Sequence, residues 1–408
     1  MQDCELYAQI LGIEKPWSVD RVDLNLEEGE VYVHLTHQED GLWPCPECGQ
    51  RCSLHDHEPV RSWRHLDTCQ YRTLVYAAVP RTKCPEHGVR TVNVPWAAPN
   101  SRFTALFERL AIDWMQEAGR SAVARRMHLT WDQADGIMQR AVRRGLARRE
   151  KQQVTCIGVD EKSFQRRHDY VTTVCDLDRG HVLYVGEHRR QETLEMFYKQ
   201  LTAEQLEGIE AVAMDMWDPY IAATRNYVPE ADEKIVFDRF HVSKQLNEAV
   251  NTIRKQEHKE LTSRQDNRLK GTKYAWLKNP ENFTHKSWRN FTALRKSTLR
   301  TARGWAIKET FRKFWDYVYR GSAANFFTRW YSWAVRSRLN PVKNVAKMLK
   351  RRLPNLLTYF RHPITNAMSE SLNAKIQWIK YTAHGFRSRE GFRNAIYFHC
   401  GGLDLYPR

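Results

Sequence analysis

The stretch Val154-Thr-Cys-Ile-Gly-Val-Asp160 is a short apolar run that ends in an acid, and Ile209-Glu-Ala-Val-Ala-Met-Asp215 repeats this pattern. Short apolar runs rich in β-branched residues are typical of buried strands. Residues 170–176 and 181–186 are two more runs of this kind, joined by a turn, and helical patterns separate the later runs. Strands that alternate with helices after a meander predict a mixed α/β sheet.

Asp160 and Asp215 are the candidate metal ligands of this sheet. Both follow strands, and neighbouring parallel strands would place them side by side. Two clustered carboxylates repel each other unless a cation neutralises them, and Mg²⁺ does so with oxygen ligands while leaving room for phosphate oxygens. Two metal ions need a third acid. Glu370 is the best candidate, because it begins an amphipathic helix near the end of the chain.

Several other acids compete for these roles. Asp238 ends the next apolar run and is the alternative third ligand. Glu161 follows Asp160 but points to the other face of the strand. Asp218 precedes a proline and is interpreted as a helix N-cap. Two further acids flank a turn and are interpreted as structural: Asp176 and Asp178.

The positive charge of the chain is concentrated in one segment. The sequence has 64 Lys+Arg and 48 Asp+Glu, a net charge of +16. Residues 241–361 hold 28 of these cations and 7 of the acids, a net of +21. Such an excess fits a polyanionic partner, most often nucleic acid. The segment is helical in pattern, and most of its many aromatic residues are expected in its core, while a minority stack on bases.

The cysteine pattern predicts a structural zinc site. Nine cysteines without a secretory signal argue against a disulfide framework and for a reduced, cytoplasmic location. Tetrahedral zinc takes four sulfur or nitrogen ligands, and two tight turns supply them here. These predicted ligands are Cys45, Cys48, Cys84 and His87. The competing ligands are Cys52 and Cys69, with His55 and His57 as weaker ones.

Three helical patterns follow this region. The first runs from Phe103 to Gly119, the second is short, and Thr130-Trp-Asp-Gln133 is a capping-box pattern that opens the third, through Val142. A short helix, a tight turn and a longer helix predict a helix-turn-helix that reads the major groove. The arginines at 140–149 would contact DNA phosphates, among them Arg140, Arg143 and Arg144. The sequence contains no run of 18 apolar residues, so we predict no membrane span.

Four motifs in order resemble the DDE transposases of bacterial insertion sequences, specifically the ISL-three group. They are Gly158-Val-Asp160-Glu-Lys-Ser-Phe164, Met214-Asp215-Met-Trp-Asp-Pro-Tyr220, Phe237-Asp238-Arg-Phe-His241 and Ser369-Glu370-Ser-Leu-Asn373-Ala-Lys-Ile376. The cysteine module and the helix-turn-helix match the amino-terminal arrangement of the same group. The resemblance covers nearly the whole chain.

This resemblance implies a ribonuclease-H-like catalytic domain in which Asp160, Asp215 and Glu370 bind two Mg²⁺ or Mn²⁺ ions. It also implies a basic all-helical insertion between the second and third acids. Asp238 and His241 would support the active site or handle flanking DNA. Lys375 and Lys380 are candidate DNA contacts, although Lys380-Tyr381 stands where the family commonly has a basic pair.

The fold class expected is therefore multidomain α+β. We expect a zinc-binding domain at 1–97, a helix-turn-helix at 98–152 and a catalytic domain at 153–241 and 362–408. The helical insertion is expected at 242–361. The expected partners are double-stranded DNA, as terminal inverted repeats and as target, and further copies of the chain, because transposition pairs two DNA ends.

Two other function classes compete with a transposase. A non-catalytic DNA-binding protein would share the DNA-binding modules but would not need the three acids. A metal-dependent nuclease or resolvase would share the catalytic fold but would not need two separate sequence-reading modules. The sequence shows no Ser-His-Asp arrangement, phosphate-binding loop or dinucleotide fingerprint.

Overall fold

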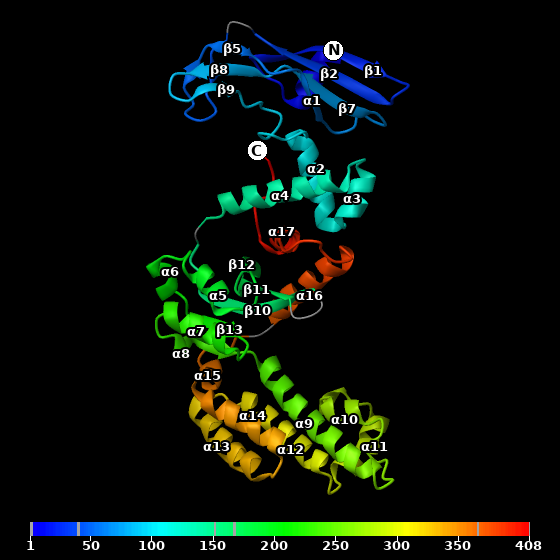
Figure 1. Ribbon diagram of the computed structural model, residues 1–408, viewed down its shortest axis with the longest axis vertical. Coiled ribbons are helices and arrows are strands. Elements are labelled where there is room, and N and C mark those ends of the chain that lie inside the picture. Colours follow the sequence, from blue (N-terminus) through cyan, green and yellow to red (C-terminus); the bar gives the residue numbers. More distant parts are fainter. Residues whose placement is uncertain (1–2, 39–40, 151, 166–168, 365–366, 408) are drawn as a thin grey trace. The chain divides into compact units, whose positions relative to one another are not determined.

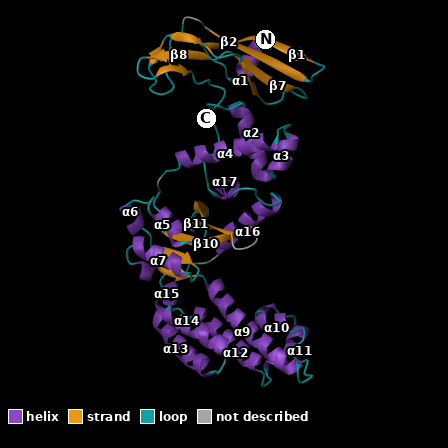
Figure 2. Ribbon diagram, in the orientation of Figure 1, coloured by secondary structure: helices purple, strands orange, loops and turns teal. Residues whose placement is uncertain are grey.

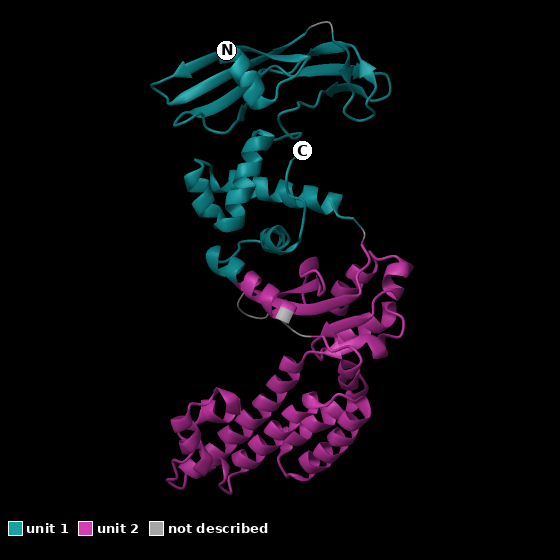
Figure 3. Ribbon diagram, turned by 180° about the vertical axis from the view of Figure 1, so that it is seen from behind, with its two compact units in different colours: residues 1–150, 378–408 teal, residues 151–377 magenta. Residues whose placement is uncertain are grey.

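A computed structural model describes residues 3–38, 41–150, 152–165, 169–364 and 367–407. The chain divides into two compact units, shown in different colours in Figure 3. Unit 1 comprises residues 1–150 and 378–408, and unit 2 comprises residues 151–377. No helix among the described residues is long and apolar enough to cross a membrane.

Unit 1 begins with a helix and a four-stranded sheet. Helix α1 (Asp3–Leu11) precedes β1 (Trp17–Asn25) and β2 (Glu30–His37), which pair as an antiparallel hairpin. Residues 21–26 and 31–35 alternate apolar and polar side chains, a pattern that predicts such a hairpin. The strand order is β1-β2-β7-β6, with β6 at Arg61–Arg64 and β7 at Arg72–Ala77. Four tryptophans form much of the core of this part: Trp17, Trp43, Trp63 and Trp96.

Two smaller sheets carry the cysteine turns. The first pairs β3 (Trp43–Pro44) with β4 (Arg51–Cys52). The second has the order β5-β8-β9. Its strands are β5 (Leu54–His57), β8 (Pro80–Cys84) and β9 (Gly88–Thr91). Each pair of predicted zinc ligands therefore lies on the turn of a short hairpin.

Four helices complete unit 1. They are α2 (Ala105–Glu117), α3 (Arg120–Arg126), α4 (Trp131–Arg148) and α17 (Arg389–Cys400). The predicted capping box of α4 is confirmed, since the Thr130 hydroxyl accepts from the Gln133 N–H and the Gln133 side chain accepts from the Thr130 N–H. Helix α4 extends one and a half turns beyond the predicted end at Val142. Its last turns are held by the chain terminus, described below.

A five-stranded mixed sheet forms one half of unit 2 (Figures 1 and 2). Its order is β12-β11-β10-β13-β14. The strands are β10 (Cys156–Gln165), β11 (Asp169–Asp176), β12 (His181–Glu187), β13 (Ala211–Met214) and β14 (Ile235–Phe237). The first three form an antiparallel meander, and β13 and β14 add in parallel to β10, so the predicted mixed sheet is confirmed.

Short helices connect the parallel strands: α5 (Gln191–Tyr198), α6 (Ala203–Glu207), α7 (Asp218–Tyr227) and α8 (Ala231–Lys234). The prediction that Asp218 caps α7 is wrong by one position, because the cap is Trp217. The exposed carboxylate of Asp218 instead accepts from Arg352 Nη2 at 2.6 Å. The structural reading of Asp176 is confirmed, since its carboxylate accepts from the N–H groups of the following turn.

Residues 239–360 form helices and turns only, and we call this stretch the helical region. Its elements are α9 (Arg239–Thr262), α10 (Lys273–Leu277), η1 (Pro280–Asn282), α11 (His285–Arg295), α12 (Arg300–Arg312), η2 (Lys313–Asp316), α13 (Arg320–Arg336), α14 (Asn340–Arg351), α15 (Leu353–Leu357) and η3 (Thr358–Phe360). Eight of its nineteen Phe, Trp and Tyr side chains are buried and seven are half-buried, while four are exposed: Phe240, Tyr274, Tyr319 and Trp333. One apolar core continues from the sheet into this region.

Candidate active site and DNA-binding modules

Strand register brings three acids to one edge of the sheet. Val159 of β10 pairs with Met214 of β13, and Met214 pairs with Phe237 of β14. The next residue on each strand is an acid: Asp160, Asp215 and Asp238. The side-by-side placement predicted for Asp160 and Asp215 is therefore confirmed, and Asp238 follows on the third strand.

The carboxylate of Asp160 is held by three donors. Lys162 Nζ lies 2.5 Å from its Oδ2, and Asn373 Nδ2 donates to the same oxygen at 3.0 Å. The N–H of Glu161 donates to Oδ1 at 2.7 Å. Lys162 is buried and lies two residues along β10, on the same face of the strand as Asp160. The ammonium group therefore neutralises Asp160 from within the strand that carries it.

Asn373 shows that the helix after the helical region returns to the sheet. It lies on α16 (Ala367–Thr382), whose first turns pack on β10. A Cβ atom at Gly158 would lie 3.3 Å from the Ser369 hydroxyl and 2.8 Å from Leu177, so a side chain there would collide. Glycine at this position permits the close approach of α16.

Asp215 is held by a guanidinium and an imidazole. Arg189 Nη2 donates to its Oδ2 at 3.4 Å, and His241 Nδ1 lies 3.4 Å from the same oxygen. His241 Nε2 lies 3.8 Å from Asp238 Oδ2, so this ring bridges two neighbouring acids. Asp238 also caps α9, because its Oδ1 accepts from the Phe240 N–H at 2.6 Å. Of the predicted supporting pair, His241 thus lies against Asp215 and links it to Asp238.

Glu161 belongs to the same electrostatic cluster. Its Oε2 lies 2.7 Å from Arg189 Nε, so one guanidinium joins Glu161 to Asp215. Burial raises the pKa of Glu161, and the nearby charge of Arg189 opposes this. The Arg189 guanidinium also stacks over the Trp217 ring, 4.1 Å from its centroid. Arg189 follows the meander with no motif around it, so its sequence context does not predict this role.

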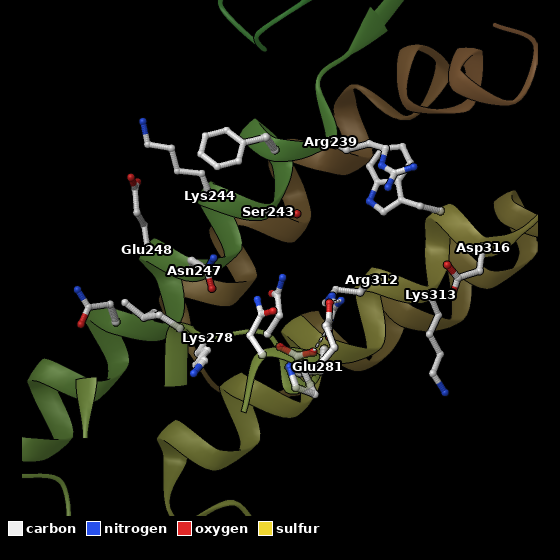
Figure 4. A pocket seen from close by; sticks show the side chains of 18 of the residues that line it. Arg239, Ser243, Lys244, Asn247, Glu248, Lys278, Glu281, Arg312, Lys313 and Asp316 are labelled. Carbon is white, nitrogen blue, oxygen red and sulfur yellow. Dashed lines mark hydrogen bonds and ion pairs between the residues drawn. The ribbon is translucent and has the colours of Figure 1, made fainter. Parts of the chain in front are cut away.

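Glu370 lies on the first turn of α16 and is exposed. It lines a cavity of about 1190 Å³ together with Arg239, Phe240 and Ser243 of α9 (Figure 4). Glu370 and Asn373 are three residues apart on one helix, which places them on neighbouring parts of its surface. Among the described residues, Asp160, Asp215 and Glu370 do not form a set with all ligand atoms within 4.8 Å of one another.

The N-terminal cysteines do form such a set. One ligand atom from each of Cys45, Cys48, Cys84 and His87 lies within 4.8 Å of the others. Cys48 Sγ is 3.7 Å from Cys84 Sγ, and Cys84 Sγ is 3.6 Å from His87 Nδ1. A tetrahedral centre with Zn–S bonds of ~2.3 Å and a Zn–N bond of ~2.0 Å requires separations of about 3.8 and 3.5 Å. The four predicted ligands therefore fit a structural zinc ion.

The rival ligands lie outside this set. Cys52 is buried beside Cys45 and Cys84, Cys69 is exposed, and His57 faces His37 with 2.8 Å between their Nε2 atoms. Hydrogen bonds from the backbone and ring of His87 lower the pKa of Cys84 to about 6. A thiol with this pKa is largely ionised at neutral pH, as a zinc ligand must be.

The predicted DNA-contacting arginines of α4 make bonds within unit 1. Arg140 and Arg144 both bond the buried carboxylate of Glu108, at 2.6 and 3.4 Å, and Arg144 also donates to the Leu405 carbonyl. Arg143 is exposed. Lys375 is exposed on α16, whereas Lys380 is half-buried with its ammonium 5.9 Å from the centre of the Phe392 ring. Their contact with DNA stays a prediction.

Comparison with known proteins matches this order of modules. The family model of the ISL3 DDE transposases, described as "Transposase", matches residues 157–396. A zinc finger of the transposases of IS204, IS1001, IS1096 and IS1165 matches residues 41–87, and the helix-turn-helix domain of transposase family ISL3 matches residues 92–142.

The chain belongs to the ISL3 transposase family. Two curated relatives are similar to this chain over more than nine-tenths of their length. The transposase for insertion sequence element IS1557 of Mycobacterium tuberculosis is 27% identical over 95% of this chain and 93% of its own. The transposase for IS1001 of Bordetella parapertussis is 25% identical over 94% of this chain and 95% of its own. The resemblance found in the four motifs is thereby confirmed, and the chain is a transposase with a zinc ribbon and a DNA-binding helix-turn-helix.

Proposed function

We propose that this transposase binds the terminal inverted repeats of its insertion sequence and catalyses DNA cleavage and strand transfer. The catalytic domain is ribonuclease-H-like, with the helical region as its insertion. Asp160, Asp215 and Glu370 hold two divalent metal ions. The observation that carries the proposal is the strand register that places Asp160 beside Asp215 while Asn373, one turn after Glu370, bonds Asp160.

The donor chemistry of this edge fits Mg²⁺ or Mn²⁺. Carboxylate oxygens are the ligands that these ions prefer. The carboxylates of Asp160 and Asp215 each pair with a protein cation, Lys162 and Arg189, which supports an edge of the sheet where positive charge is favourable. Bound metal ions would supply a nucleophilic hydroxide or activated 3′-hydroxyl and stabilise the leaving oxygen.

The residues of the chain would contribute positioning. Asn373 and the N–H of Glu161 fix the orientation of the Asp160 carboxylate, and Arg189 and His241 fix that of Asp215. Fixed ligands are important because a displacement of about 1 Å can cost about 100-fold in rate. The exposed carboxylate of Glu370 would join them from α16, beside the cavity that the start of α9 lines.

A cleavage assay tests this assignment. DNA that carries the sequences flanking the gene is incubated with Mg²⁺ or Mn²⁺ and with Asp160→Asn, Asp215→Asn or Glu370→Gln protein. We expect each variant to lose cleavage and strand transfer and to retain binding of the same DNA. Asp218→Asn is the matched control, because this acid is exposed and pairs with Arg352, and it should cleave normally.

Two results would contradict parts of the proposal. Cleavage by Glu370→Gln but not by Asp238→Asn would make Asp238 the third metal ligand. Tight binding to the element ends without cleavage by the unmodified protein under any metal would favour the non-catalytic DNA-binding protein.

A further inference from the structure

The positive charge of the helical region is unevenly distributed. Of the 28 cations and 7 acids in residues 241–361, residues 241–316 hold 18 cations and all 7 acids. Residues 317–361 hold the other 10 cations and no acid. This acid-free stretch forms α13, α14 and α15. Residues 317–361 therefore carry a net charge of +10 in 45 residues, while the 76 residues before them carry +11. The two long helices α13 and α14 and the segment after them are the more densely charged part of the helical region.

Most of these cations make no ion pair. Arg352 pairs with Asp218 and Arg361 pairs with Glu233. The other eight have no acidic partner within 4.0 Å anywhere in the part of the chain that the structure describes. Seven are exposed and Lys343 is half-buried. They are Arg320, Arg329, Arg336, Arg338, Lys343, Lys347, Lys350 and Arg351.

Helix α14 arranges its cations as a row. Val342, Val345, Ala346 and Leu349 face the core and are buried. Lys343, Lys347 and Lys350 recur at intervals of four and three, so they share one side of the helix that flanks the buried face, and we call these three residues the α14 lysine row. At ~1.5 Å per residue the row extends about 10 Å, close to the ~12 Å width of a major groove. Lys350 lies 4.6 Å from the centroid of the Tyr331 ring of α13.

The cavity beside Glu370 differs in charge. Its lining includes five cations, Arg239, Lys244, Lys278, Arg312 and Lys313, and five acids, Glu248, Glu281, Glu309, Asp316 and Glu370. Arg312 bonds Glu281 and Glu309 inside it (Figure 4). Acids in this lining oppose a phosphate backbone, whereas α13 and α14 offer cations in a stretch without any acid.

We propose that the α14 lysine row, with the neighbouring cations of α13, binds the phosphate backbone of duplex DNA that lacks the terminal repeats, which is the target DNA. This inference rests on the proposed function. Lysine meets phosphate as a point charge and lacks the planar fork with which arginine reads guanine. Contacts of this kind hold DNA without reading its sequence. Such binding suits target DNA, because under the proposed function the helix-turn-helix already recognises the sequence of the element ends.

The test compares two triple variants of the full chain. Lys343→Gln/Lys347→Gln/Lys350→Gln removes the row. Lys255→Gln/Lys259→Gln/Lys270→Gln is the matched control, since these lysines are exposed, lie in the acid-containing part of the helical region and change the net charge equally. The probe is a random-sequence duplex of about 30 base pairs without terminal repeats, titrated over a range of salt concentrations.

Each lost phosphate contact lowers the slope of log K against log [salt] by about 0.9. We expect the row variant to lose about 2 to 3 in slope and at least ~10-fold in affinity at low salt. The control variant should keep the slope of the unmodified protein. Both variants should bind a terminal-repeat probe far more tightly than the random duplex, because the helix-turn-helix is unchanged.

The possible outcomes separate this proposal from the proposed function. An unchanged slope in the row variant overturns the target-DNA surface, whatever the protein cleaves. A reduced slope in a protein that never cleaves supports the surface and contradicts the catalytic assignment. Tighter, row-dependent binding of an RNA duplex of the same sequence would make RNA the partner and overturn the proposal. If the triple variant does not fold, Lys347→Gln alone should lower the slope by about 1.

Discussion

Arg189 is the residue whose role the structure defines and the sequence does not. Its guanidinium lies between Glu161 and Asp215, on two different strands, and is itself covered by Trp217. Sequence reasoning could place Asp160 beside Asp215 because each follows a short apolar run. The expectation that the strand ends at Asp160 was wrong, because β10 continues to Gln165 in its pairing with β11. It could not find Arg189, because the turn after β12 decides where this side chain points. Lys162 is different, because side chains alternate along a strand. Residues two apart share a face, so the sequence predicts Lys162 on the same face of the strand as Asp160.

Arg189 should stabilise unit 2 through Glu161. Arg189→Ala leaves a partly buried carboxylate without its cation, and we expect the free energy of unfolding to fall by about 1–3 kcal/mol. The double variant Arg189→Ala/Glu161→Gln should recover part of this loss, because the uncompensated charge is then absent. Urea denaturation measures both.

The neighbouring Arg190 provides the control. It is exposed and its side chain does not cap α5, so Arg190→Ala should change the free energy of unfolding by less than about 0.5 kcal/mol. Equal stabilities of the single and double variants would show that Glu161 does not depend on Arg189.

His65 makes the stability of unit 1 depend on pH. Its ring is buried, with Nδ1 2.9 Å from the Thr104 hydroxyl, and burial lowers its pKa from 6.5 to about 4. Between these values the unfolded chain binds a proton that the folded chain does not, so stability is complete above pH 6.5 and is lost as the pH falls toward 4. The full loss is about 3 kcal/mol.

His65→Gln isolates this contribution. The amide is uncharged at every pH and can still reach the Thr104 hydroxyl. The difference in free energy of unfolding between native protein and variant should therefore shift by about 3 kcal/mol in favour of the variant from pH 7 to pH 4. Zinc release in acid affects both proteins and cancels. A pH-independent difference would mean that the pKa of His65 is the same in the folded and the unfolded chain.

At the scale of elements, the sequence predicted those with strong periodicity. The β1–β2 hairpin, the strands of the meander and the capped start of α4 all carry such patterns. The short strands β3, β4, β5 and β9 do not, because turns that bear metal ligands shape them more than a continuous apolar face does. Helix α4 was predicted too short because its last turns are arginine-rich and lose the apolar period, while Glu108 and the chain terminus hold them.

The zinc-binding turns should depend on metal. Cys48→Ser removes one of the four clustered ligands, and we expect zinc content to fall from about one ion per chain toward zero, because structural zinc sites require all four ligands. The N-terminal sheets should then unfold at a lower temperature. Metal analysis and thermal unfolding monitor this. Cys69→Ser, at an exposed cysteine outside the cluster, should retain zinc; zinc loss in this variant instead would reassign the ligands.

The capping box of α4 allows a test of what stabilises the start of this helix. Thr130→Ala removes the hydroxyl that accepts from Gln133 and should lower the free energy of unfolding by about 1 kcal/mol. Thr130→Ser keeps the acceptor and should behave as the native protein. Equal losses in both variants would show that the methyl group of Thr130, not its hydroxyl, stabilises the helix.

At the scale of the whole molecule, the last residues of the chain pack on α4, and local sequence patterns do not predict this contact. Residues 401–407 follow the last helix, α17, and form no helix or strand. In the structure, Leu405 is 2% exposed, and the arginines of α4 bond the carbonyls of Leu405 and Tyr406. A Cβ atom at Gly145 would lie 2.7 Å from the Leu403 side chain, so α4 needs glycine there. Contacts over more than 250 residues of sequence leave no periodic signal.

This contact predicts that the last residues stabilise the helix-turn-helix. Leu405→Ala creates a cavity at a fully buried site, and we expect the free energy of unfolding of unit 1 to fall by about 2–4 kcal/mol, with no change in unit 2. Leu24→Ala, at a side chain that is 55% exposed, should change it by less than about 0.5 kcal/mol. Two thermal transitions that shift independently would be the expected signature. If Leu405→Ala were as stable as Leu24→Ala, the packing of the terminus on α4 would contribute nothing, and the arginines of α4 would be released for DNA.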